Sequence, residues 1–343
     1  MKSYRYILFS TIVMLAVGCS NELTEKAALD VDIIENETVS REGDTILVKK
    51  DAPVIFNLAG DPDNIAFYSG EAGSEFRYRD RDQVDPEEIE SSKLSFSVWA
   101  QYGNASTAAN VLKMMISDSF PGLMKNDFKA DSATVEGFAW QELVPQADLP
   151  QAPGNANGAK AFEIDLTPHL GKRLAIAISY TGHSNTAAQP RMNFVDMKIE
   201  NKLKNGTTSV LYAGNFGFTP INMMCHHNLQ DQRSMNGNRE YGTVTNNTSG
   251  IWNLKDASTG NFFIHSSGKE SDLKYSWLVS NLIMTNACSP DNGIAIKNIT
   301  KRLDTYSYTY NKVGVYKATF IATNSNYEHE SRVVRELNIK VVE

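Results

Sequence analysis

The sequence predicts an all-β protein built from tandem β-sandwich domains. Three observations lead to this class. Many short runs alternate large apolar residues with small or polar ones, as half-buried strands do. Glycine, proline, asparagine and aspartate separate these runs, and helical patterning is thin. The chain has 343 residues and is 41% apolar, so it is long enough to bury more than one core.

Eight runs carry the strand pattern most clearly. They are residues 45–50, 52–58, 94–100, 162–166, 174–180, 306–310, 316–322 and 336–342. The connection 311–314 has hairpin length and ends in Gly314, which tolerates a positive φ angle. Residues 143–158 contain three prolines and two glycines and therefore predict a loop.

One short helix is expected within residues 105–117. The apolar residues at positions 111, 112, 115 and 116 have the spacing of one helix face. A strand that follows a loop would explain the same residues.

The order of these features predicts four segments. Residues 1–18 are a signal peptide, and residues 19–35 are a polar, acidic-leaning tether. Residues 36–203 form an N-terminal β region, and residues 204–343 form a C-terminal β-sandwich. The boundary between them is placed at Lys202–Gly206, because this polar run ends in a glycine turn. No repeat of 20–50 residues is visible.

The N-terminus has the features of a secretory signal. Lys2 and Arg5 precede the apolar run 7–17, which is shorter than the ~20 residues that span a bilayer. Cys19 directly follows Gly18, and this ending resembles the lipobox of bacterial lipoproteins. The resemblance implies cleavage before Cys19 and acylation of that cysteine, which would anchor the chain to a membrane. A plain signal peptide with an incidental cysteine is the alternative.

The charge of the chain argues against two classes of partner. The formal net charge is −7, and loss of residues 1–18 would also remove Lys2 and Arg5. An acidic chain without a long basic run is not expected to bind nucleic acid, nor a membrane surface by electrostatics. Membrane attachment would come from acyl chains, of which two or more suffice for stable anchoring.

Two cysteines remain besides Cys19. An exported chain permits a disulfide between Cys225 and Cys288, and two buried free thiols are the alternative. Cys225 begins the run Cys225-His226-His227. Zinc sites need about four convergent ligands, and neighbouring residues on a strand point to opposite faces. We therefore expect no metal at this run.

The sequence carries no specific catalytic motif, so the chain is not expected to be an enzyme. Carboxylates are plentiful, but a glycosidase needs two of them held roughly 5–10 Å apart, which sequence cannot show. Two oxygen-rich clusters, 61–64 and 80–85, could hold calcium, although turn chemistry and solvated charge are the favoured explanation of both. No other cofactor is expected.

Aromatic residues are the better indication of a binding protein, because a tryptophan or tyrosine ring can lie flat on the C–H face of a sugar. Trp252 lies among polar residues in a predicted loop, and Tyr241 precedes the same stretch. Trp99 and Phe96 fall on opposite faces of one predicted strand, so one of the two faces outward. Trp252, Tyr241 and Trp99 are therefore the candidate ligand-binding residues. For Trp252, a loop anchor packed on the sandwich is the alternative, and Trp277 is expected in the core.

Several stretches resemble surface lipoproteins of gut Bacteroidales that carry a domain of unknown function. They are residues 54–71, 275–280, 287–291 and 293–299. Residues 306–342 also resemble the closing strands of polycystic-kidney-disease (PKD) domains, which are Ig-like, and residues 85–203 resemble jelly-roll modules that bind carbohydrate. Genes of such lipoproteins tend to lie beside SusC/SusD-like nutrient importers. The resemblance implies an outer-membrane location, facing the cell exterior, with transporter components as partners.

Together these features lead to three functional hypotheses. The first is a non-catalytic surface lipoprotein that captures a nutrient, most simply a glycan, for a SusCD-like transporter. The second is a structural or adhesive accessory lipoprotein of a transporter complex, with peptide as another ligand class. The third is a glycosidase or peptidase.

Overall fold

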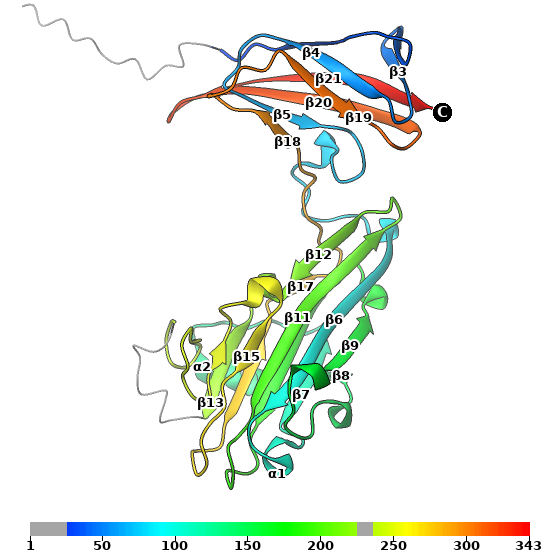
Figure 1. The fold of residues 1–343 in the computed structure, drawn as a ribbon. Coiled ribbons are helices and arrows are strands. Elements are labelled where there is room, and N and C mark those ends of the chain that lie inside the picture. Colours follow the sequence, from blue (N-terminus) through cyan, green and yellow to red (C-terminus); the bar gives the residue numbers. More distant parts are fainter. Residues whose placement is uncertain (1–25, 225–235) are drawn as a thin grey trace, which may run out of the picture. The chain divides into compact units, whose positions relative to one another are not determined.

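The computed structural model describes residues 26–224 and 236–343 (Figure 1). It confirms the all-β class, with 46% of residues in strands and 12% in helices. The chain forms two compact units. One, here called the discontinuous sandwich, combines the residues up to Arg79 with Asn292–Glu343. The other, the central sandwich, is Asp80–Asp291.

The discontinuous sandwich is built from strands at both ends of the chain. One sheet has the order β1-β4-β19, and the other has the order β18-β5-β20-β21-β3-β2. Their bounds are β1 (Asp30–Ile33), β2 (Val39–Glu42), β3 (Thr45–Lys49), β4 (Pro53–Ala59), β5 (Asn64–Tyr68), β18 (Ile294–Lys297), β19 (Thr305–Thr309), β20 (Gly314–Ser325) and β21 (Glu330–Val342).

An aromatic cluster fills the core between these two sheets. Phe56 of β4 meets Phe320 of β20 edge-on, with ring centroids 5.0 Å apart, and Phe67 of β5 lies 4.8 Å from Phe320. The buried Tyr310 donates its hydroxyl to the carbonyl of Ser69 at 2.9 Å. The two halves of this unit, which are more than 200 residues apart in sequence, therefore share one core.

The central sandwich consists of a front sheet and a back sheet. The front sheet has the order β14-β15-β11-β6-β9, with β12 paired to β11; the back sheet has the order β13-β16-β10-β7-β8, with β17 paired to β10. Their bounds are β6 (Ile89–Gln101), β7 (Leu112–Ser117), β8 (Gln141–Val144), β9 (Lys160–Asp165), β10 (Arg173–Thr181), β11 (Arg191–Leu203), β12 (Thr208–Tyr212), β13 (Thr219–Met224), β14 (Trp252–Asn253), β15 (Phe262–Ile264), β16 (Tyr275–Val279) and β17 (Ile283–Met284).

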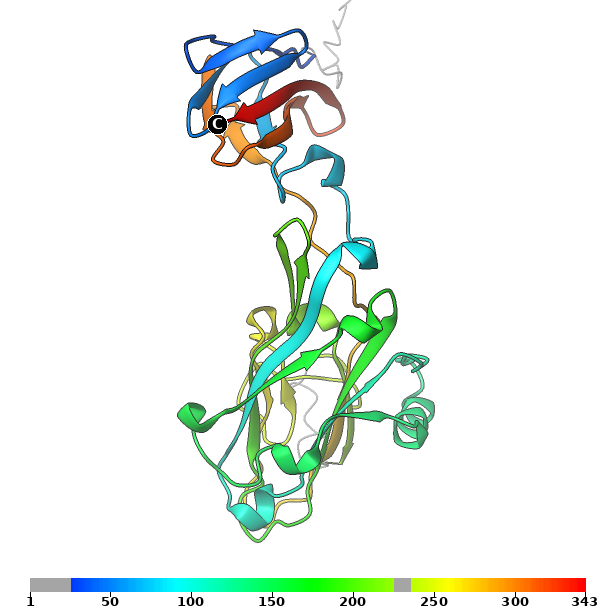
Figure 2. The same cartoon turned by 90° about the vertical axis from the view of Figure 1, so that its right-hand side faces the viewer.

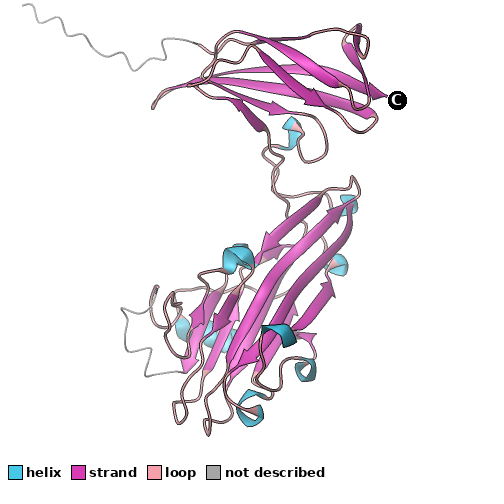
Figure 3. Cartoon of the chain, viewed as in Figure 1, coloured by secondary structure: helices cyan, strands magenta, loops and turns pink. Residues whose placement is uncertain are grey.

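Helical segments are short and lie outside the strand layers (Figure 3). The two α-helices are α1 (Ala105–Ala108) and α2 (Phe128–Gly137). The remaining segments are single 3-10 turns: η1 (Phe76–Tyr78), η2 (Pro86–Glu88), η3 (Gln146–Asp148), η4 (Ala156–Gly158), η5 (Thr167–His169), η6 (Ala213–Phe216) and η8 (Ala257–Thr259). Among the described residues, no helix is long and apolar enough to cross a membrane.

The front sheet follows the alternation that its sequence predicts. Strand β6, drawn in cyan, runs along the length of the central sandwich (Figure 2). Its residues Leu94, Phe96, Val98 and Ala100 are buried in the core against the back sheet, while the residues between them are half-exposed or exposed. One face of this sheet is therefore core and the other is accessible.

The back sheet differs, because both of its faces are buried. Leu174, Ile176 and Ile178 of β10 enter the main core. Ala175 and Ala177 enter a second cluster with side chains from residues 118–140, among them the buried Val135 of α2. The prediction that β10 is half-buried is therefore wrong, because a covering segment packs on its outer face.

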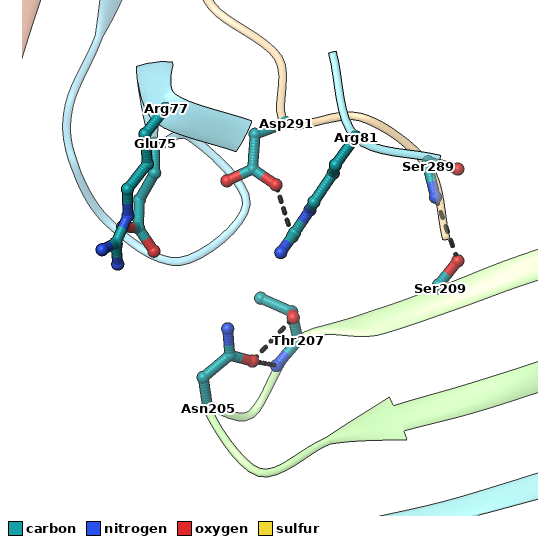
Figure 4. A network of polar contacts seen from close by, with 8 residues as sticks. All are labelled: Glu75, Arg77, Arg81, Asn205, Thr207, Ser209, Ser289 and Asp291. Atoms are coloured by element: carbon teal, nitrogen blue, oxygen red, sulfur yellow. Dashed lines mark hydrogen bonds and ion pairs between the residues drawn. The ribbon is translucent and has the colours of Figure 1, made fainter. Parts of the chain in front are cut away.

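An ion pair joins the two ends of the central sandwich. Arg81, near its start, and Asp291, at its end, point toward each other (Figure 4), with Nη2 and Oδ1 2.5 Å apart. The Asp291 side chain is only 2% exposed. Nearby, the backbone N–H of Ser289 donates to the hydroxyl of Ser209 at 3.2 Å, which ties the last residues of the unit to β12.

The structure divides the chain differently from the predicted boundary after residue 203. Leu203 ends β11, which forms a hairpin with β12 in the front sheet, so Lys202–Gly206 is a turn inside one domain. The domains predicted as 36–203 and 204–343 are replaced by a sandwich of both chain ends and an inserted one. The reason is non-local pairing: β21 pairs with β3 and β20 with β5. The predicted tether 19–35 is wrong in its last residues, because Asp30–Ile33 form β1, which pairs with β4.

The predicted helix at 105–117 is correct only at its start. Asn104 caps α1, and its side chain accepts from the N–H of Thr107 at 3.2 Å. Of the apolar residues that suggested a helix face, Leu112, Met115 and Ile116 belong instead to β7, which pairs with β10, and Val111 directly precedes this strand.

Candidate functional site

Trp252 lies inside the central sandwich and not on an exposed loop. Its side chain is fully buried in the main core. The indole Nε1 donates to the hydroxyl of Ser276 at 2.9 Å. The ring packs against that of Phe262, with ring centroids 6.4 Å apart. The interpretation of Trp252 as a ligand platform is therefore wrong, since a buried ring cannot meet a ligand. The alternative, a packed anchor, is correct.

Tyr241 also has a structural role. Its hydroxyl donates to Oδ2 of Asp131 at 2.8 Å, and Asp131 is buried in α2. Burial, and next the hydrogen bond to Asp131, raise the pKa of Tyr241. Asp131 also accepts from the backbone N–H groups of Met124 and Lys125, both at 2.7 Å. Tyr241 thus fastens the segment that covers the back sheet, and nothing in its contacts indicates a platform.

Trp99 is the candidate that the structure leaves accessible. Phe96 points into the core, whereas Trp99 is half-buried on the outer face of the front sheet. Trp99 is opposite Asn193 of β11, and Asn193 is opposite Phe263 of β15. Because directly paired residues share a face of the sheet, these three side chains form one row across three strands.

Arg191 joins this row from the start of β11. Its guanidinium carbon lies 3.4 Å from the ring centroid of Phe263, a cation–π contact, and its Nε donates to Oδ1 of Asn193 at 2.7 Å. Burial lowers the pKa of Arg191, and the Tyr102 hydroxyl acts in the opposite direction. Tyr102 follows β6 and is 53% exposed. Its φ angle is +69°, a value that non-glycine residues rarely adopt.

A buried layer of side chains holds this row in place. His265 meets Phe263 edge-on, with ring centroids 4.6 Å apart, and burial lowers the pKa of His265 to about 4. The fully buried Lys274 donates from Nζ to the carbonyls of His265 and Pro190, both at 2.8 Å. It also places its ammonium 3.9 Å from the ring centroid of Tyr180. Lys274 therefore fixes the backbone at the residues that position Phe263 and Arg191.

A groove of about 280 Å³ continues along the same face from Trp99. Three of its outward positions on β6 and β9, Ser95, Ser97 and Ala161, carry small side chains, which leave room above the sheet. The groove is lined by Ser95, Phe96, Ser97, Ala161, Phe162, Glu163, Val195 and Asp196. This volume lies at the lower end of the ~300–1,000 Å³ that ligand sites occupy.

A β-bulge shapes one side of the groove. The pairing of β11 with β6 shifts between Val195 and Lys198, and Asp196 has a positive φ of 52°. Gly260 permits this bulge, since a Cβ at Gly260 would lie 2.5 Å from the nitrogen of Met197. Bulges re-aim side chains and are frequent beside functional sites, and this one brings Val195 and Asp196 to the groove.

We call this surface the front-face site: Trp99, Tyr102, Arg191, Asn193, Phe263 and the groove. Its rings offer flat apolar surfaces, and its hydroxyl and guanidinium groups offer hydrogen bonds. Small-molecule sites commonly combine apolar walls with a few placed polar groups. The charged groups at the far end, Glu163 and Asp196, are ion-paired with Lys93 and Lys198.

The discontinuous sandwich has a larger pocket, of about 550 Å³. Lys317 and Glu336 on its wall pair at 3.1 Å, and Arg77 and Glu75 pair at 2.6 Å. We place the candidate site on the front sheet because the accessible Trp99, the cation–π pair of Arg191 and Phe263, and a groove lie there on one face.

Several predicted features lie outside the described residues, namely Cys19, the run Cys225-His226-His227 and one half of the proposed disulfide. Cys288 is described and half-buried beside Leu203 and Val84, and burial raises the pKa of its thiol.

The oxygen-rich clusters have local roles in turns. Asp61 lies 3.2 Å from Nζ of Lys297, which also donates to the carbonyl of Pro62. Asp85 caps η2 by accepting from the N–H of Glu87. Within residues 26–224 and 236–343, no group of three or more His, Cys, Asp or Glu side chains is arranged to hold a metal ion.

Fold and site together define an all-β protein of two sandwiches with an accessible aromatic and polar sheet face. Residues 19–216 match the family described as a domain of unknown function (DUF5017). This match spans more than half of the chain, and the chain therefore belongs to that family. The matched region includes Trp99, Arg191 and Asn193 and ends before Phe263. No curated protein matches the chain.

Sequence reasoning missed four residues of this site: Tyr102, Arg191, Asn193 and Phe263. Arg191 and Asn193 lie two apart at the start of a strand, and Phe263 follows the candidates Tyr241 and Trp252 in the sequence. The sequence does not show that β6, β11 and β15 pair with one another. This pairing brings Trp99 and Phe263 into one row, although more than 160 positions separate them in the chain.

Proposed function

We propose that this chain is a non-catalytic surface lipoprotein that binds a glycan at the front-face site. The proposal depends above all on one observation: Trp99 is half-exposed on an open sheet face, beside a groove with small polar side chains. A sugar ring could stack on Trp99 while its hydroxyls meet Ser97 and the rim of the groove. The anchor would be Cys19, and tethering would raise the effective concentration of the site at the membrane.

The setting of this binding is also a proposal. The lipobox-like Cys19 and the resemblance to surface lipoproteins of Bacteroidales support an outer-membrane location facing the exterior. The same resemblance supports delivery of the bound glycan to a SusC/SusD-like transporter.

Isothermal titration of the acyl-free chain against a panel of polysaccharides tests the proposal. We expect at least one glycan to bind, and Trp99→Ala to weaken its binding at least tenfold, as expected for a central aromatic contact. Tyr327→Ala is the matched control, because Tyr327 is 79% exposed in the discontinuous sandwich, and it should leave binding unchanged. Binding of peptides and of no glycan would refute the glycan assignment.

The carboxylates of the groove support a binding role over a glycosidase. Glu163 and Asp196 have side chains 63% and 58% exposed, and each pairs with a lysine. A glycosidase acid is kept protonated by a desolvated setting, which these solvated groups lack. Release of reducing sugar from any bound polysaccharide, lost in Glu163→Gln, would contradict this.

An accessory role is the second candidate, and one observation favours it. Val313 and Val315 are 50% and 76% exposed at the β19–β20 hairpin, and exposed apolar side chains suit a protein contact. Co-purification with a transporter that Val315→Asp abolishes, without any soluble ligand, would favour this role.

A further inference from the structure

We propose that the front-face site selects glycans that carry a carboxylate, with Arg191 as the group that receives it. This inference rests on the proposed glycan binding and adds the chemical class of the ligand. It concerns the end of the site formed by β11 and β15, where Arg191 lies on Phe263.

The position of Arg191 is fixed in two ways. Its guanidinium lies on the ring of Phe263 at 3.4 Å, and its Nε is held by Oδ1 of Asn193 at 2.7 Å. Asn193 itself is only 7% exposed. These contacts use one face and one N–H of the guanidinium, so its two terminal nitrogens keep their donors. A planar pair of donors matches the two oxygens of a carboxylate.

The charges around Arg191 favour an anion. Within the described part of the chain, no carboxylate forms an ion pair with Arg191. The acidic groups of the face, Glu163 and Asp196, pair with Lys93 and Lys198. By the rise per residue, Asp196 lies roughly 16 Å and Glu163 roughly 20 Å from Arg191 along the strands. The fully buried Lys274 donates to the carbonyl of Pro190, the residue before Arg191, and this second cation adds to the positive potential at this end.

Burial makes the cation more receptive to an anion. Desolvation lowers the pKa of Arg191, which means that its charged form is poorly solvated where it lies. A carboxylate would replace the missing solvation, because charge-assisted bonds are about twice as strong as neutral ones. His265, the other titratable side chain against Phe263, is neutral at pH 7 because burial lowers its pKa to about 4, so it does not compete for the anion.

The distance between Trp99 and Arg191 suits a single sugar residue. Trp99 is opposite Asn193, and Arg191 is therefore its diagonal neighbour, at about 7–8 Å between backbone positions. A ring stacked on Trp99 can direct a carboxylate at its edge toward Arg191. Tyr102, which is near enough to affect the pKa of Arg191, would border the same position.

The test compares each uronate polysaccharide with its carboxyl-reduced form. The purified full-length chain, in detergent, is titrated with polygalacturonate, alginate, hyaluronan and glucuronoxylan, and with each after its carboxyl groups are reduced to alcohols. We expect at least one uronate polysaccharide to bind, and reduction to weaken it at least tenfold. Arg191→Gln should remove this difference, whereas Arg173→Gln, at an exposed arginine of β10, should keep it.

The outcomes separate this inference from the proposed function. If neutral glycans bind through Trp99 and the wild-type chain shows no preference for the carboxylate form, the inference is wrong and glycan binding stands. If no glycan binds, both are wrong. Tighter binding of a sulfated glycan than of any uronate would overturn the assignment of the anion as a carboxylate. The comparison in the wild-type chain decides the matter even if Arg191→Gln does not fold.

Discussion

The two sheets of the central sandwich have similar strand architecture, but the outer face of one is covered by another segment and the outer face of the other is accessible. On the back sheet, residues 118–140 pack over β10 and β16, and they bury Trp277 beneath Trp140 and Phe120. On the front sheet, the outward residues of β6 and β9 stay accessible, and Trp99 is half-exposed among them. An outward tryptophan is thus part of a core in one case and part of a surface in the other.

This difference shows what a tryptophan on a strand can be taken to mean. Trp99 and Trp277 both lie in apolar strands. The prediction that Trp277 lies in the core is confirmed, whereas Trp99 is half-exposed. What separates them is whether another segment of the chain covers the sheet. The covering segment is held by Asp131 and Tyr241, and it is this segment that closes the back sheet while the front sheet stays open.

The largest effect should come from exchanging a covered tryptophan for a small residue. Trp277→Ala should lower the free energy of unfolding of the central sandwich by about 3–5 kcal/mol, because it leaves a cavity under the covering segment. Trp99→Ala should change it by less than about 1 kcal/mol, as for a surface position. Urea denaturation of both variants measures this. Equal losses of stability would contradict this, because they would mean that both tryptophans are packed to the same extent.

A smaller effect is expected from loosening the cover itself. Asp131→Ala removes the acceptor of two backbone N–H groups and of the Tyr241 hydroxyl, and should cost about 2–3 kcal/mol. Hydrogen exchange should quicken in residues 118–140 and stay unchanged in β6 and β11. Asp256→Ala, at an exposed aspartate of the same unit, is the control. Faster exchange throughout both sheets would show that the cover is not a separate layer.

The layer behind the front face predicts a dependence on pH. Burial lowers the pKa of His265 to about 4 in the folded chain, below the ~6.5 of an unfolded histidine. Protonation therefore favours the unfolded state, and this stability is lost as the pH falls from 6.5 through 4, by at most about 3 kcal/mol. His265→Asn should lose less stability than wild type between pH 7 and pH 4.5 in urea titrations. Identical pH profiles would place His265 in contact with water.

The smallest effect concerns the hydroxyl that ties the cover to the sandwich. Tyr241→Phe keeps the ring beside Phe128 and removes one hydrogen bond, so it should cost about 1 kcal/mol. Thermal unfolding measures this loss, and glycan binding should be unaffected. Weaker glycan binding by Tyr241→Phe would indicate that the Tyr241 hydroxyl contacts the ligand.

Local patterning predicted much of the fold and little of the site. Alternation identified eight strands and placed Phe96 and Trp99 on opposite faces, because the period of a strand is two wherever it pairs. Alternation failed at β10, where Ala175 and Ala177 leave room for a covering segment that the strand itself does not indicate.

The errors share one physical cause. Trp252 is flanked by polar loop residues, yet the short pairing of β14 with β15 carries it into the core. Arg191 and Phe263 meet only because β11 and β15 pair. The domain boundary was misplaced for the same reason, since β3 and β21 come from opposite ends of the chain. Pairing between strands that are distant in sequence determines each of these features, and the local pattern of a single sequence does not reveal which strands pair.

Hydrogen exchange with a bound glycan tests the central claim most directly. The full-length chain is compared with and without the tightest polysaccharide found by titration. The account predicts slower exchange in β6, β11 and β15, around Trp99 and Arg191, and no change in β10 and β16 of the back sheet. Protection confined to the back sheet or to the discontinuous sandwich would contradict it, because the ligand would then bind away from the open face.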